Sequence, residues 1–86
     1  MSYKGGTLTY REFMQRAKPF GVDEIRSKQQ TSRRKLERTK PDGTKPWTTV
    51  PKVTGEGQRE LNRVEINGIL RRLEFTDEEY DAFNRG

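Results

Sequence analysis

The sequence contains no cysteine and no histidine, and these absences exclude several classes of site. Without cysteine there is no disulfide framework and no thiolate metal site, and without histidine the usual general base is missing. No apolar run approaches the roughly 18 residues of a membrane span, and the N-terminus lacks the apolar core of a signal peptide. We therefore expect a cytoplasmic, intracellular protein with no membrane segment, no metal ion and no cofactor.

Hydrophobic residues are also few. They make up 28% of the 86 residues, while charged residues make up 36%, a balance that leans towards disorder. The apolar residues nevertheless fall into a few periodic segments, which favours a small folded core. A chain of this length holds one small domain at most, and its core must be thin.

Positive charge is concentrated between Arg26 and Lys40, where seven of fifteen residues are Lys or Arg and only Glu37 opposes them. Glutamine and hydroxyl side chains that can bind bases or phosphates lie within this run. Such a stretch suits the surface of a polyanion, and nucleic acid is the commonest one. The alternatives are a solvated basic helix face or a disordered tail.

The charge differs from one end of the chain to the other. The net charge is +7 over residues 1–40, +1 over residues 41–59 and −3 over residues 60–86. A basic N-terminal part and an acidic C-terminal part would orient the molecule on an anionic partner. They would also allow the acidic end of one copy to meet the basic end of another.

Local signals predict a first helix from Tyr10 to Ala17. Thr9 and Glu12 have the spacing of a capping box, and Pro19 and Gly21 end the helix. Beyond this point the sequence leaves two alternatives open. One long basic helix would place Ile25 and Leu36 on the same face, because they are eleven residues apart. Otherwise the helix breaks near 29–31 and a short helix runs from Ser32 to Arg38.

The sequence predicts a turn and a hairpin in the middle of the chain. Pro, Asp and Gly in Lys40–Pro46 indicate a turn. The β-branched and aromatic residues from Trp47 to Val53 predict a strand, with Pro51 making it an edge strand or a bulged one. Glycines at 55 and 57 suggest a hairpin tip, and residues 58–61 return.

Two more capping boxes predict the C-terminal helices. Asn62 and Glu65 precede the clearest apolar stripe of the chain, which runs from Ile66 to Leu73. Thr76 and Glu79 open a short acidic helix from Asp77 to about Phe83. Its carboxylates could bind Mg²⁺ or act as an acid pair, but negative charge in a helix first turn is already favourable. With no catalytic constellation in the sequence, we predict that the protein is not an enzyme.

This order of elements resembles the small winged-helix DNA-binding domains of phage excisionases and their MerR-like relatives. The matching segments are LTYREFMQRA (Leu8–Ala17), FGVDEI (Phe20–Ile25), TSRRKLER (Thr31–Arg38) and RELNRVEINGIL (Arg59–Leu70). The resemblance implies a small α+β winged-helix protein that binds and bends double-stranded DNA in a host bacterial cell. It further implies a recombinase partner, because such factors direct a recombinase towards excision, and some repress transcription.

The residues expected to contact nucleic acid come from the basic run and the wing. They are Arg26, Lys28, Gln29, Gln30, Thr31, Arg33, Arg34, Lys35, Arg38, Lys52 and Arg59. Arginine can pair with guanine and glutamine with adenine, although half or more of such hydrogen bonds usually go to the nucleic-acid backbone. We expect Trp47 to pack in the core or at the wing base, with base stacking as the alternative.

The acidic helix supports a rival interpretation. We divide the chain into a flexible segment 1–7, a DNA-binding domain 8–75 and an acidic helix 76–86. In the rival, Tyr80 and Phe83 of that helix bind a protein, as in a small phage-type interaction protein that modulates a host enzyme. The same edge could instead dock on its own domain or support self-association on DNA. An RNA-binding or structural basic protein is a third alternative.

Overall fold

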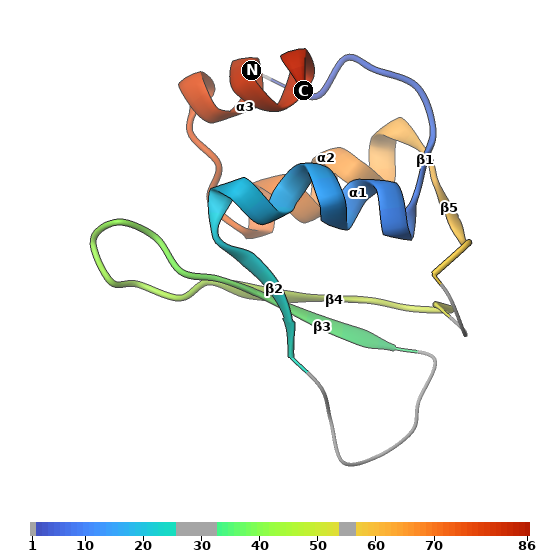
Figure 1. Ribbon diagram of the computed structural model, residues 1–86, viewed down its shortest axis with the longest axis horizontal. Helices are drawn as coiled ribbons and strands as arrows, with labels where there is room; N and C mark the ends of the chain where they lie inside the picture. The colour runs from blue at the N-terminus through green and yellow to red at the C-terminus, as the bar shows by residue number, and fades with distance from the viewer. Residues whose placement is uncertain (1, 26–32, 54–56) are drawn as a thin grey trace.

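The computed structural model describes residues 2–25, 33–53 and 57–86 of an α+β chain (Figure 1). A three-stranded antiparallel sheet has the order β2-β3-β4, and a two-stranded sheet pairs β1 with β5. The elements in chain order are β1 (Leu8–Thr9), α1 (Tyr10–Ala17), the 3-10 helix η1 (Lys18–Phe20), β2 (Val22–Ile25), β3 (Arg34–Arg38), β4 (Trp47–Val50), β5 (Glu60–Leu61), α2 (Arg63–Arg72) and α3 (Asp77–Arg85). The predicted α+β class is confirmed.

Helix α1 has the predicted bounds and the predicted cap. The Thr9 hydroxyl accepts from the Glu12 backbone N–H at 3.1 Å, and the Glu12 carboxylate accepts from the Thr9 N–H at 3.0 Å. After η1, Gly21 has a φ of 85° and turns the chain into β2. A Cβ at this position would lie 2.5 Å from the carbonyl oxygen of Thr39, so the sharp turn requires glycine.

The segment after Gly21 is a strand, and the prediction of a basic helix is wrong there. Strand β2 pairs antiparallel with β3, with Val22 opposite Arg38 and Glu24 opposite Leu36. The acidic helix-start signal is worth at most about 1 kcal/mol, whereas the pairing buries Val22 and Leu36 in the core. The proposed helix break near 29–31 lies outside the described residues.

The predicted turn Lys40–Pro46 is confirmed, and it joins β3 to β4. The N–H of Gly43 donates to the Lys40 carbonyl, the N–H of Lys40 donates to the Thr44 carbonyl, and both distances are 2.9 Å. The Asp42 carboxylate accepts from the Thr44 N–H at 2.9 Å and closes the turn. Figure 1 shows the resulting hairpin loop projecting beyond the helices.

The predicted hairpin between β4 and residues 58–61 is wrong. Strand β4 pairs with β3, and Glu60–Leu61 pairs instead with Leu8–Thr9. Pro51 cannot donate a ladder hydrogen bond, and Lys52 has a φ of 61°, which turns the chain away from the sheet. Residues 54–56 of the predicted tip lie outside the described residues.

Helices α2 and α3 are confirmed with their capping boxes. The Asn62 side chain accepts from the Glu65 N–H at 2.8 Å, and the Thr76 hydroxyl accepts from the Glu79 N–H at 3.2 Å. Helix α3 continues to Arg85, two residues beyond the expected end.

All three helices lie on the same side of the β2-β3-β4 sheet, and the core fills the space between them (Figure 1). The predicted stripe of α2 is buried there, with Ile66, Leu70 and Leu73 completely inaccessible. Trp47 is 58% exposed, so its expected place in the core is wrong. It alternates with the buried Thr48 and Val50 and therefore points to the sheet face that bears no helix.

Residues 2–6 lie against α2 and α3, although the sequence suggests a flexible start. The Tyr3 N–H donates to the Asn67 side-chain oxygen at 2.7 Å, and the Asn67 amide donates back to the Tyr3 carbonyl at 3.1 Å. Asn84 bridges the Lys4 N–H and the Ser2 carbonyl in the same way. The Tyr3 ring meets Phe83 at a centroid distance of 5.5 Å, which joins this segment to the core.

Candidate nucleic-acid interface

Strand register brings together cations that are far apart in the sequence. Arg34 at the start of β3 lies opposite Val50 at the end of β4. Arg33 and Lys52, which flank these residues along the chain, therefore lie at the same end of the sheet, and both are exposed. A separation of nineteen positions in the sequence becomes proximity in space because β3 and β4 are antiparallel.

Helix α1 adds a further cation to this end. The Arg11 N–H donates to the Gly57 carbonyl at 3.0 Å, which holds the first turn of α1 against the chain that follows β4. The Arg11 side chain is exposed. We call Arg11, Arg33, Arg34 and Lys52 the basic end. Sequence patterns did not identify Arg11, because a lone arginine in a helix first turn has no distinctive signal.

Within the basic end, the charge of Arg34 is partly balanced by a carboxylate of the same domain. The Arg34 Nε lies 3.8 Å from a Glu24 carboxylate oxygen, which also accepts from the Tyr10 hydroxyl at 2.6 Å. Burial raises the pKa of Tyr10 well above its ordinary value, and the hydrogen bond to Glu24 adds to this effect. Tyr10 therefore stays protonated and orients the carboxylate that faces Arg34.

Arg59 is engaged in a similar way. Its guanidinium donates to a Glu65 carboxylate oxygen at 2.5 Å. This hydrogen bond lowers the pKa of Glu65, so the carboxylate remains ionised and keeps its partner.

Lys35 occupies the helix-free sheet face, where its ammonium lies 4.8 Å from the centre of the Trp47 ring.

Arg38 is removed from the predicted contact surface, because its side chain is 1% exposed. Its guanidinium donates to the carbonyls of Phe20 at 3.1 Å, Leu73 at 3.1 Å and Glu74 at 3.0 Å, and it also donates to the Glu79 carboxylate. Arg38 therefore ties the sheet to the α2–α3 connection. A basic run does not distinguish such a structural arginine from a surface one.

The remaining predicted contacts of the basic run are not located by the structure. Arg26, Lys28, Gln29, Gln30 and Thr31 lie outside the described residues.

The structure buries Tyr80 and Phe83, the two residues predicted to bind a protein. Their side chains are 7% and 1% exposed, and Phe83 contacts the rings of Phe13 and Phe20. The aromatic edge of α3 therefore docks on its own domain, which was the alternative given by the sequence.

The acidic first turn of α3 lies at the other end of the sheet. Arg38 is about 13 Å along β3 from Arg34, and its guanidinium binds the Glu74 carbonyl and the Glu79 carboxylate. Within the described ranges, no group of three or more His, Cys, Asp or Glu side chains is placed to hold a metal ion. No helix in the described part of the chain is long and apolar enough to cross a membrane.

Comparison with known proteins identifies no relative: no family model, no curated protein and no solved structure matches this chain.

Proposed function

We propose that this protein binds double-stranded nucleic acid through its basic end. The observation that carries the proposal is that Arg11, Arg33 and Lys52, from three separate parts of the chain, lie at the same end of the sheet, while the acidic turn of α3 is held at the far end by Arg38. Such a charge distribution orients the molecule, because phosphates attract one end and repel the other.

The contacts are to phosphates rather than to base edges. Reading bases in the major groove usually needs a helix or a two-stranded ribbon that enters the groove. Arg34–Arg38 is the middle strand of the sheet, with β2 on one side and β4 on the other. The exposed cations at its end can instead approach the backbone of a duplex, which carries one negative charge per ~1.7 Å of its axis.

An excisionase-like role is a narrower form of this proposal. It would specify DNA, a winged-helix arrangement and a recombinase partner, as the sequence resemblance implies. The described basic residues form a strand where that arrangement requires a recognition helix, and α2 is the helix that follows the predicted wing. The broader function, binding of a duplex by its phosphates, rests on the charge geometry alone.

The test is a binding titration with matched charge variants. Fluorescence anisotropy measures the affinity for a labelled random-sequence DNA duplex over a range of salt concentrations. The double variant Arg33→Ala/Lys52→Ala removes two cations from the basic end. The control Lys18→Ala/Lys45→Ala removes two exposed cations near the opposite end. Both variants lower the formal net charge from +5 by the same amount.

We expect the first variant to bind more weakly and to lose roughly two units of slope in log affinity against log salt. The control should keep nearly all of the wild-type slope. Equal losses in both variants would show that only net charge matters and would reject the basic end as a site. Duplex RNA and single-stranded DNA, measured in parallel, decide which nucleic acid the site prefers.

A further inference from the structure

Strand β4 forms an edge of the sheet, because among the described strands it pairs only with β3. The Arg38 N–H donates to the Pro46 carbonyl at 2.9 Å, so Pro46 faces β3. Backbone groups alternate in direction along an antiparallel strand, so Trp47 and Thr49 direct theirs away from β3. Such unpaired groups are a template for pairing with another strand.

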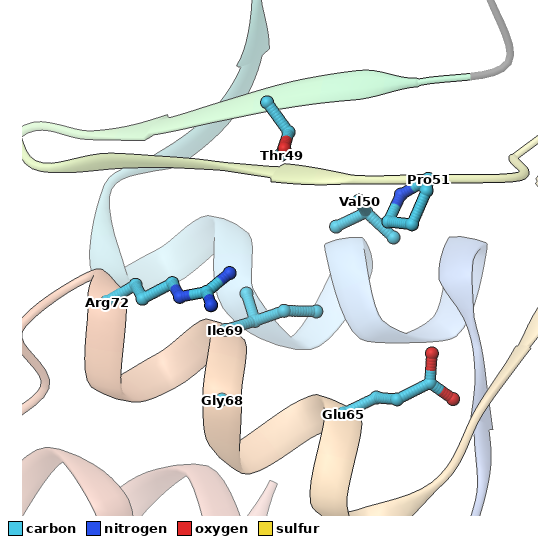
Figure 2. A pocket seen from close by; sticks show the side chains of 7 residues that line it. All are labelled: Thr49, Val50, Pro51, Glu65, Gly68, Ile69 and Arg72. Atoms are coloured by element: carbon cyan, nitrogen blue, oxygen red, sulfur yellow. The ribbon is translucent and has the colours of Figure 1, made fainter.

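An open groove lies beside this edge, between β4 and α2 (Figure 2). It has a volume of about 210 Å³, and Val50, Pro51, Gly68 and Ile69 give it apolar walls. Glu65 lies at one end and Arg72 at the other. Val64, one helical turn before Gly68 on the same side of α2, is 80% exposed. An exposed apolar strip beside a strand edge indicates an interaction surface.

The charges on this surface are self-complementary. Gly68 lies near the midpoint between Glu65 and Arg72, which are about 10.5 Å apart along the helix. A two-fold axis passing near Gly68 would bring Glu65 of one copy opposite Arg72 of the other, and Val64 onto the stem of Arg72. A closed symmetric dimer needs this property, because the same patch must match itself.

We propose that a second copy of this chain binds here, with the two β4 edges paired antiparallel and the two α2 helices crossing at Gly68. Pairing around Thr49 joins the two three-stranded sheets into one continuous sheet. Gly68 allows the helices to approach closely, since a Cβ at this position meets no atom within 4 Å in the single copy. The Glu65 carboxylate accepts from Arg59 through one oxygen and from the Asn62 N–H through the other, and each oxygen of an ionised carboxylate has a second lone pair for a further donor.

The substitution Gly68→Gln separates this interface from the fold. In the monomer the new side chain has free space, and the helix gains from the loss of an internal glycine, so the melting temperature measured on dilute monomer should rise. In the dimer the same side chain keeps the helices apart. Sedimentation equilibrium should show a dimer for the wild type and a dissociation constant at least about tenfold higher for the variant.

Two further variants complete the test. Thr49→Pro removes an N–H from the free edge without removing a bond to β3, and it should also weaken the dimer. Glu78→Gln, at an exposed position of α3, is the control and should leave the dissociation constant unchanged. A wild type that stays monomeric at millimolar concentration overturns the proposal. So does a dimer that neither Gly68→Gln nor Thr49→Pro weakens, because its interface must then lie elsewhere.

Discussion

Replacing Arg38 with alanine should strongly destabilise the fold, because this residue is a buried polar link between the sheet and α3. The substitution removes the donor for three backbone carbonyls and leaves the Glu79 carboxylate, itself only 24% exposed, without its partner. Removing one member of a buried ion pair typically costs about 3–5 kcal/mol. The total stability of an 86-residue domain is roughly 4–13 kcal/mol, so the loss is a large part of it.

Arg34→Ala is the matched control, because it makes the same chemical change four residues earlier in the same strand. The Arg34 side chain is 30% exposed, and its Nε lies 3.8 Å from Glu24, so the expected cost is about 0–1 kcal/mol. Urea unfolding followed by circular dichroism measures both variants. Midpoints that fall equally for Arg34→Ala and Arg38→Ala would refute the structural role assigned to Arg38.

The same link predicts a dependence on pH. Partial burial raises the pKa of Glu79, but hydrogen bonds from Thr76 and the charge of Arg38 outweigh it and place the pKa below its ordinary value. A depressed carboxylate pKa stabilises the fold above the unfolded value of roughly 4.3, and this contribution is lost as the pH falls through the folded pKa. Glu79→Gln should therefore lower the free energy of unfolding at neutral pH. The difference in this free energy between the variant and the wild type should shrink in acid. A constant difference would contradict this.

Three other outcomes follow from the packing. Leu70→Ala should cost about 2–5 kcal/mol in urea unfolding, because Leu70 is completely buried, and a midpoint close to wild type would contradict its central position. Deleting residues 76–86 should unfold the protein, since it removes Phe83 and the Glu79 contact; a cooperative melt of the truncated chain would show that α3 is dispensable. Acrylamide should quench Trp47 fluorescence in the native protein nearly as well as in urea, because the side chain is 58% exposed, and strong native protection would place Trp47 in an interface.

Local chemistry determined the helices of this protein. The residue before each α-helix accepts, through its side chain, a hydrogen bond from the backbone N–H of the third helical residue. That third residue is Glu12, Glu65 or Glu79, and its carboxylate accepts from the backbone N–H of the residue before the helix. These contacts span three residues, so a short stretch of sequence contains all the atoms involved. The turn Lys40–Pro46 and the apolar stripe of α2 could be predicted for the same reason.

Tertiary structure decided the strands and the fate of individual charges. Whether Val22–Ile25 is helix or strand depends on its pairing with β3, and β4 pairs with β3 rather than with residues 58–61. Burial of Arg38 and exposure of Trp47 both reverse the usual preference of their residue types. They follow from which face of the sheet the helices cover, and sheet pairing and helix placement depend on contacts between residues far apart in the chain.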